Sequence, residues 1–125
     1  MDKEQCMQAF LEAEAFDGPS IIIAYAQCIA HGYDIVGKGM KQAKKAGDTG
    51  YWPMYRFNPE NHNSEKPVFS WDAPEATMQF GEFTEVENRY KILSRAMPAE
   101  AERLQGLAKV DNERRYQDFM NLKNS

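Results

Sequence analysis

The chain has 125 residues and a mass of 14.4 kDa, with 42% hydrophobic and 27% charged residues, a composition typical of one soluble globular domain. Its net charge of -4 argues against a nucleic-acid binder, because phosphate contacts need clustered basic residues. The densest apolar stretch, at residues 21–26, is far shorter than the ~18 to 20 residues that cross a bilayer, and the polar first residues lack the apolar region of a signal peptide. Two cysteines are too few for a disulfide framework, so we expect a cytoplasmic protein.

A helix is predicted at residues 3–15. Asp2 can cap its first turn, and Gln5 follows three residues later, as in a capping box. Because apolar side chains recur at helical spacing, we expect one face of this helix to be buried. These side chains are Cys6, Met7, Phe10, Leu11 and Ala13. The Asp-Gly-Pro sequence at residues 17–19 then indicates a turn.

A strand is predicted at residues 20–26, where three consecutive isoleucines stand in an apolar run without alternation. Such a run is typical of a strand buried on both faces of a parallel sheet, and a short buried helix is the less favoured alternative. Both edges of this strand need hydrogen-bonding partners, yet the sequence contains no second run of this kind. We therefore expect the neighbouring strands on another chain or on sequence missing here.

The middle of the chain predicts a helix and a hairpin. The helix covers residues 33–46 and ends near Gly47 and Gly50. Residues 51–57 are predicted as an edge strand, because Pro53 cannot donate a hydrogen bond to a central ladder. After a polar loop, residues 68–71 are the expected hairpin partner, and residues 72–79 look irregular.

The last third is predicted to be helical. A stripe of apolar residues at helical spacing runs through Phe83, Val86, Tyr90, Leu93 and Met97. Pro98 stops that helix or opens the next, and the final helix carries its own apolar stripe. We expect Asp111 and Arg115 to pair at i, i+4 spacing within it.

Cys28 is the main candidate for chemistry. It directly follows the predicted strand, and the carboxyl ends of parallel strands are where α/β sheets place ligand-binding residues. Gly32 would let the backbone come close to a bound group. The alternative is an inert buried cysteine, because free cysteines are among the most buried residues, and Cys6 is interpreted in this way too.

Cys28 and His31 form a Cys-x-x-His pair with several interpretations. A zinc finger is not expected, because the other candidate ligands, Cys6 and His62, form no second close pair. Two thiols also exclude an iron–sulfur cluster held by this chain alone. A thiol enzyme with His31 as the base is a further alternative, although no third group that would orient His31 is evident. Four lysines at positions 38, 41, 44 and 45 indicate a solvated helix face or a docking patch for an acidic partner.

Four blocks of this sequence resemble pyruvate:ferredoxin (flavodoxin) oxidoreductases, at the C-terminal part of their thiamine-diphosphate domain. The blocks are Phe-Leu-Glu-Ala-Glu-Ala-Phe-Asp-Gly-Pro-Ser at 10–20, Ile-Ile-Ile-Ala-Tyr-Ala-Gln-Cys-Ile-Ala-His-Gly at 21–32, Gly-Tyr-Trp-Pro-Met-Tyr-Arg-Phe-Asn-Pro at 50–59 and Glu-Asn-Arg-Tyr at 87–90. The resemblance covers essentially the whole chain. It implies a partial three-layer α/β thiamine-diphosphate-binding fold, with residues 1–80 as the C-terminal portion of that domain and residues 81–125 as its helical tail.

The resemblance also implies a function. Members of this family convert pyruvate and coenzyme A to acetyl-CoA and carbon dioxide and pass electrons to ferredoxin or flavodoxin. They use thiamine diphosphate, magnesium and iron–sulfur clusters. In the segment that resembles residues 25–32, the family's cysteine is the fourth ligand of the 4Fe-4S cluster nearest the thiamine. Cys28 is the matching residue here, and the resemblance therefore favours a ligand over an inert thiol.

This chain lacks other parts of the family pattern. It has no Gly-Asp-Gly followed by Asn-Thr-Gly-Gly for the diphosphate and magnesium, and Gln27 and Ala30 stand where proline and asparagine are common. We therefore expect a fragment or split piece that is inactive alone and binds the remainder of the oxidoreductase or a companion subunit, as a homo-oligomer when complete. A free-standing interaction module, using the stripe at 83–97 as its partner-binding surface, is the alternative.

Overall fold

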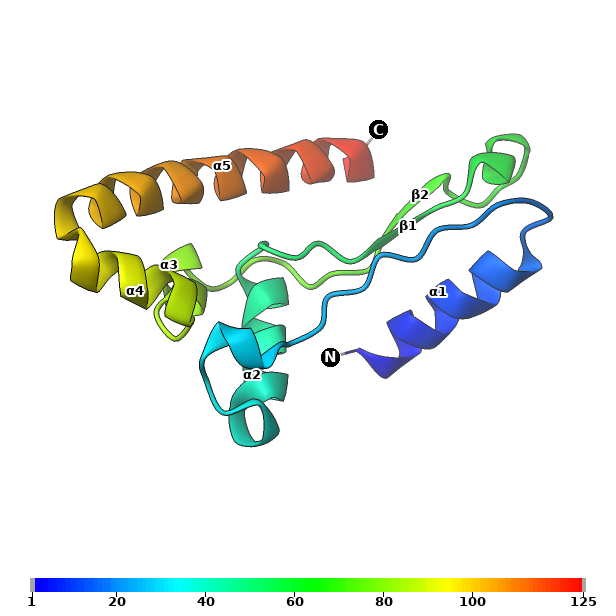
Figure 1. Cartoon of the computed structure of the whole chain (residues 1–125). Helices are drawn as coiled ribbons and strands as arrows, with labels where there is room; N and C mark the ends of the chain where they lie inside the picture. The colour runs from blue at the N-terminus through cyan, green and yellow to red at the C-terminus, as the bar shows by residue number, and fades with distance from the viewer. Residues whose placement is uncertain (1, 125) are drawn as a thin grey trace.

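The computed structural model describes residues 2–124, and it mixes helices with one two-stranded sheet, as expected for a broadly α/β chain (Figure 1). In chain order the elements are α1 (Lys3–Ala15), the 3-10 helix η1 (Ile29–His31), α2 (Ile35–Asp48), β1 (Tyr55–Phe57), the 3-10 helix η2 (Pro59–Asn63), β2 (Phe69–Trp71), α3 (Phe80–Thr84), α4 (Asn88–Ala96) and α5 (Pro98–Asn124). Within the described residues, no helix is both long and apolar enough to span a bilayer.

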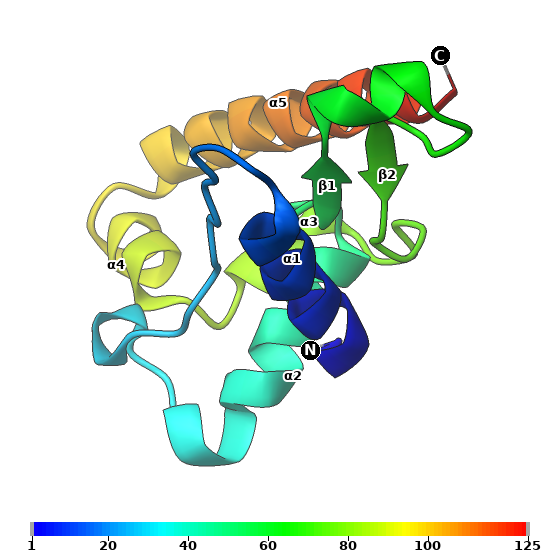
Figure 2. The ribbon, with the colours of Figure 1, turned by 90° about the vertical axis from the view of Figure 1, so that its right-hand side faces the viewer.

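The predicted hairpin is confirmed. β1 and β2 pair in antiparallel fashion, with Tyr55 opposite Trp71 and Phe57 opposite Phe69. The rings of Tyr55 and Phe69 lie 5.3 Å apart, and that of Phe119 on α5 lies 5.1 Å from Tyr55. These aromatic contacts hold the long C-terminal helix against the hairpin. The ribbon of α5 passes behind the hairpin in the turned view (Figure 2).

The core is small and lies where α2, α3 and the segment before β1 meet. Ala46, Phe80 and Phe83 are buried there, and the partly buried Tyr51 stacks on Phe83 with ring centroids 4.5 Å apart. Gly50 turns the chain out of α2 with a φ of 69°, against the ring of Tyr116. A side chain at position 50 would clash with that ring. This explains why the residue that turns the chain out of α2 is a glycine.

α1 has the predicted bounds and the predicted Asp2 cap, but the prediction that one of its faces is buried is wrong. None of its residues is buried, and Met7, Phe10 and Leu11 are among the exposed apolar side chains. Within residues 2–124, that face is only partly covered. Cys6 is exposed as well, so it is not the buried cysteine that its place on the helix suggested.

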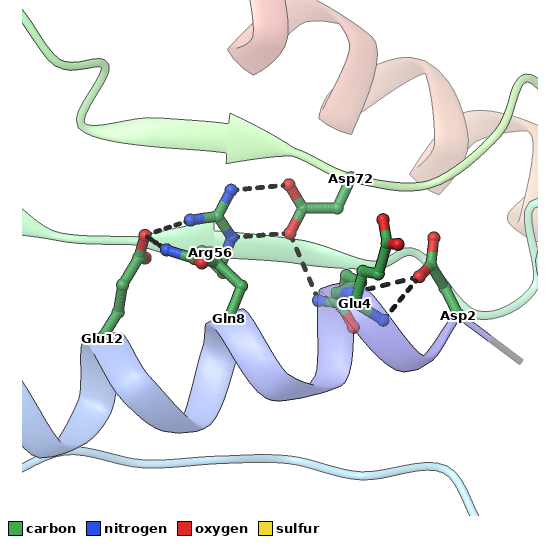
Figure 3. Close-up of polar contacts among 7 residues, drawn as sticks. Asp2, Glu4, Gln8, Glu12, Arg56 and Asp72 are labelled. Carbon is green, nitrogen blue, oxygen red and sulfur yellow. Dashed lines mark hydrogen bonds and ion pairs between the residues drawn. The ribbon is translucent and has the colours of Figure 1, made fainter.

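A polar network holds α1 to the hairpin instead (Figure 3). The Arg56 guanidinium donates to both carboxylate oxygens of Asp72, at 2.7 and 2.9 Å, and to Glu12 on α1. Gln5 donates to Asp72 at 3.2 Å, and Gln8 donates to Glu12 at 2.7 Å. The hydrogen bond from Gln8, followed by Arg56 and opposed by partial burial, lowers the pKa of Glu12 below its ordinary value.

Residues 20–26 form no strand, which corrects the prediction of a buried one. The segment runs as an extended chain without ladder partners among the described residues, and the side chains of Ile21 and Ile23 are 87% and 73% exposed. The extended course agrees with the β-branched sequence, but a strand also needs a neighbour to pair with. Local propensity is satisfied here and the non-local requirement is not.

The helix predicted through residues 83–97 is two helices. α3 ends at Thr84 and α4 begins at Asn88, with Glu87 as its N-cap residue. Phe83 is fully buried and Met97 is exposed, so the stripe is not one surface. Pro98 opens α5, as one of its two predicted roles required.

The predicted ion pair between Asp111 and Arg115 is also wrong. Asp111 accepts instead from Arg114, one residue nearer, at 2.5 Å. Arg115 donates to the backbone carbonyl of Tyr51 at 2.6 Å, and the buried Asn112 donates to that of Thr49 at 3.0 Å. Both long-range hydrogen bonds tie α5 to the chain just after α2.

The described residues expose far more surface than a compact protein of this mass. Their accessible area is 9058 Å². A folded monomer of 14.4 kDa is expected to expose about 6,800 Å². Together with the uncovered face of α1 and the unpaired segment 20–26, this excess indicates that large apolar surfaces remain to be covered.

Candidate functional site around Cys28

Cys28 lies at the junction between the extended segment and η1. It is the N-cap residue of that short helix, and its carbonyl accepts a hydrogen bond from the backbone N–H of His31 at 2.9 Å. Its thiol is exposed and forms no disulfide. The expected burial in the alternative of an inert buried cysteine is therefore wrong, because Cys28 lies exposed on a turn.

Two contacts fix this turn in place. Before Cys28, the side chain of Gln27 donates to the carbonyl of Gly39 on α2 at 2.7 Å. After it, Gly32 has a φ of 74° and lies directly against Asn88. A Cβ at position 32 would come within 2.4 Å of the Asn88 Cβ, so glycine is required for both its backbone conformation and its lack of a side chain.

A buried polar cluster lies on the α4 side of the turn, and the η1 turn lies next to α4 in Figure 2. The Glu87 side chain is fully buried, accepts from Gln42 at 3.3 Å and forms an ion pair with Arg89 at 2.7 Å. Burial, and next the charge of Glu87, raise the pKa of both Tyr25 and Tyr33 above the usual tyrosine value. The hydroxyls of Tyr25 and Tyr33 are buried without a hydrogen-bond partner.

The other predicted candidates are not gathered into a site. Among residues 2–124, no group of three or more His, Cys, Asp or Glu side chains is arranged to hold a metal ion. His62 lies in η2, within the hairpin loop. The Nδ1 atom of His31 is buried without a hydrogen-bond partner, so no side chain orients this imidazole as a catalytic base.

The four lysines of α2 do not form one free basic surface. Lys44 forms an ion pair with Asp48 at 2.5 Å. Lys45 donates to the carbonyl of Glu82 at 2.9 Å and approaches Glu85 at 3.5 Å. Only part of the lysine charge therefore remains for an acidic partner.

The donor set around Cys28 fits one ligand of an iron–sulfur cluster and no more. A thiolate is the side chain that such clusters use, and Cys28 presents a free, exposed thiol. With no metal-binding group assembled in the described part of the chain, the remaining ligands would have to come from outside it.

The sequence reasoning missed the polar cluster. The sequence contains one sign of a buried polar group. Glu87 stands four residues after Phe83, so on a continuous helix its carboxylate would lie beside the apolar stripe at 83–97. A carboxylate at that spacing either disrupts a buried face or serves as a buried polar group. The structure shows the second case.

No family model matches the chain. Individual proteins do match, along nearly its whole length. The pyruvate:ferredoxin oxidoreductase of Moorella thermoacetica is 42% identical over 118 residues, which is 94% of this chain and 10% of that protein. The pyruvate-flavodoxin oxidoreductases of Nostoc sp. and Enterobacter agglomerans are 40% and 39% identical, over 95% and 99% of this chain and 10% and 11% of those proteins.

The chain thus spans about a tenth of the length of the curated relatives that it matches. The match includes the Cys28 turn and both sides of the buried cluster, because it leaves no more than a few residues of the chain uncovered. By this similarity the chain resembles one segment of the pyruvate:ferredoxin and pyruvate-flavodoxin oxidoreductases.

Proposed function

We propose that this chain is a fragment or split piece of a pyruvate:ferredoxin or pyruvate-flavodoxin oxidoreductase. Identity of about 40% along nearly the whole chain, against a tenth of each relative, carries the proposal. Residues 1–80 would be the C-terminal portion of the thiamine-diphosphate-binding domain and residues 81–125 its helical tail. The excess accessible surface supports this proposal, because a piece of a larger domain leaves its inner faces uncovered.

In this proposal the extended segment 20–26 becomes a sheet strand once the rest of the domain supplies its neighbours. Its backbone is already extended, and its isoleucine side chains are among the most exposed apolar groups of the chain. Pairing would satisfy the free N–H and C=O groups on both edges and remove those side chains from water. The remainder of the polypeptide, or a companion subunit, is the partner that this surface needs.

The chemical role of the chain would be to supply one thiolate. Cys28 is proposed as the fourth ligand of a 4Fe-4S cluster, a group that would supply electron transfer in the complete enzyme. The chain's own residues would hold that thiolate in place. Gln27 forms a hydrogen bond that attaches the turn to α2, and Gly32 lets the turn pack directly against Asn88. Alone, the chain would bind neither a complete cluster nor thiamine diphosphate and magnesium, and would be inactive.

The complete protein would oxidise pyruvate and pass electrons to ferredoxin or flavodoxin, the substrates that the relatives' names give. Coenzyme A would take part as the resemblance to this family implies. We place it in the cytoplasm and expect a homo-oligomer. Neither nucleic acid nor a membrane is among the proposed partners.

Replacing Cys28 in the complete oxidoreductase tests the proposed role. Cys28→Ala should lower the iron and acid-labile sulfide content by one 4Fe-4S cluster per polypeptide, because alanine cannot bind iron. Cys6→Ala is the matched control, since Cys6 is the other exposed cysteine, and it should leave both contents unchanged. Full iron and sulfide in the Cys28→Ala protein would exclude this residue as a ligand.

Two alternatives have less support. An interaction module would use the stripe at 83–97, but Phe83 is fully buried and the stripe is split between α3 and α4. A thiol enzyme would need His31 oriented as a base, and its Nδ1 has no hydrogen-bond partner. Slow labelling of Cys28 by iodoacetamide at neutral pH would count further against the thiol enzyme.

A further inference from the structure

Two adjoining cavities lie between segment 20–26 and the hairpin, and we call them together the slot. Each has a volume of about 300 Å³, and both are lined by Ile21 and Ile23 on one side and by Tyr55 on the other. The segment and β1 lie side by side and run in opposite directions (Figures 1 and 2). A single water molecule needs only about 10–15 Å³, so the slot has room for a much larger group.

Helices cover the slot on both faces. Cys6, Ala9 and Phe10 on α1 line one of its cavities, and Arg115 and Phe119 on α5 line the other. In the turned view, α1 lies on the near side of the hairpin and α5 on its far side (Figure 2). A space between two extended segments, with a helix on each face, is the place that a central strand occupies in a three-layer α/β sheet.

The backbone groups along both edges of the slot are unpaired. Toward β2, the Met54 carbonyl accepts from the N–H of Asp72 and the N–H of Asn58 donates to the Val68 carbonyl, both at 2.9 Å. Because these directions alternate along a strand, the N–H and C=O of Tyr55 point away from β2, on the side of the slot. Among the described residues, neither these groups nor the backbone of segment 20–26 has a hydrogen-bond partner.

Contacts at both ends of the segment keep the slot open. The Ser20 hydroxyl donates to the Ala13 carbonyl of α1 at 3.0 Å, and the Gln27 side chain donates to the Gly39 carbonyl of α2 at 2.7 Å. Arg56 in turn attaches α1 to the hairpin. The segment is therefore held beside β1 without pairing with it. An extended chain is the group that offers N–H and C=O along both of its edges, as the two sides of the slot require.

We propose that the slot receives an apolar β-strand from the remainder of the oxidoreductase polypeptide, inserted between segment 20–26 and β1. This inference rests on the proposed function, in which the chain is a piece of that enzyme. The inserted strand would pair with the segment along one edge and with β1 along the other, which joins both to β2 in one sheet. Since α1 and α5 cover its two faces, its side chains would be apolar on both, as in strands buried within a parallel sheet.

Hydrogen exchange in the complete, unmodified oxidoreductase measures the proposed backbone pairing. The amide of Tyr55 faces the slot, and that of Arg56, the next residue, faces β2, so Arg56 is the matched control. We expect the Tyr55 amide to exchange as slowly as that of Arg56, at least about a hundredfold slower than an amide of an unfolded chain. A Tyr55 amide that exchanges at the rate of an unfolded chain would overturn the proposal.

A cysteine scan distinguishes an inserted strand from direct closure of the segment onto β1. In a Cys6→Ala background, Tyr55→Cys is combined in turn with a cysteine substitution at each of positions 21–24, and the complete enzyme is oxidised mildly. An inserted strand keeps the two backbones about 9.5 Å apart, whereas a disulfide needs Cα atoms within about 7 Å, so no disulfide should form. Tyr55→Cys with Trp71→Cys is the positive control, because these residues are directly opposite in the hairpin.

A disulfide between position 55 and any of positions 21–24 of the same chain would show direct closure and contradict the inserted strand. A disulfide between two copies would show that a second chain fills the slot, with the same consequence. If Cys28→Ala loses one cluster while the Tyr55 amide exchanges freely, the inserted strand is wrong and the role of Cys28 stands. If Cys28→Ala keeps every cluster while Tyr55 is protected and the scan gives no disulfide, the inserted strand stands and the role of Cys28 is wrong.

Discussion

At the scale of single residues, the glycine at position 32 determines how the Cys28 turn is built. Its φ of 74° is a conformation that side chains other than glycine disfavour by about 1–2 kcal/mol. Asn88 also occupies the space where a Cβ would lie. The backbone conformation and the contact with α4 therefore impose the same requirement on one residue.

We predict that Gly32→Ala destabilises the complete protein by at least about 1–2 kcal/mol and displaces the Cys28 turn, lowering cluster content. Gly106→Ala is the control, because Gly106 lies inside α5 with open space around it, and alanine there should stabilise the helix by up to about 1 kcal/mol. Denaturant unfolding and iron analysis of the two variants measure both effects. Equal stability and equal iron content for the two would show that the turn does not depend on Gly32.

At the scale of secondary-structure elements, α1 is attached by charge more than by apolar contact. Its helix is well formed, with the Asp2 side chain accepting from the backbone of Glu4 and Gln5, yet it buries none of its residues. The Arg56 guanidinium bridges Glu12 on α1 to Asp72 beyond β2, and so connects three segments that are distant in sequence. A planar group with several donors is suited to bridging two carboxylates in this way.

We predict that Arg56→Lys loosens α1 selectively, since an ammonium cannot reproduce the paired hydrogen bonds to Asp72 and still reach Glu12. Hydrogen bonds to charged groups contribute about 1.5–3 kcal/mol each, so hydrogen exchange in residues 3–15 should quicken by about tenfold or more. Arg103→Lys is the control, because Arg103 pairs with Glu100 on the exposed surface of α5. Unchanged exchange in α1 of the Arg56→Lys protein would show that other contacts hold this helix.

The sequence was informative wherever a structural feature depends on neighbouring residues. The bounds of α1 and the pairing of β1 with β2 follow from caps, turns and alternation, which are local signals. Segment 20–26 was misjudged because a strand depends on partners that residue order within this chain does not supply. The break before α4 was missed because the apolar spacing continues through it, while the buried Glu87 caps a new helix.

The site shows the same division. The place of Cys28 directly after the apolar, β-branched run at 20–26 is a local feature of the sequence. The burial of Glu87 could not be predicted, since its carboxylate is enclosed by packing distant in sequence and accepts from Gln42 on α2. Long-range packing of this kind leaves only a faint trace in the sequence, here one carboxylate near an apolar stripe.

At the scale of the whole molecule, the described residues leave an unusually large area accessible to solvent. Their accessible area exceeds that of a compact monomer by about a third, and the apolar faces of α1 and of segment 20–26 are uncovered. Exposed backbone edges and apolar patches of this size promote association with other chains. The proposal that the chain is a piece of a longer oxidoreductase would account for these uncovered faces.

The most direct test of this account is the size of the native species that carries this sequence. Extract of the source cells would be separated under native conditions and probed with an antibody to residues 98–125. The account predicts an iron-containing species far larger than 14.4 kDa, because the proposed remainder of the enzyme would cover the exposed faces and supply the other cluster ligands. A species of 14.4 kDa under native conditions would contradict it.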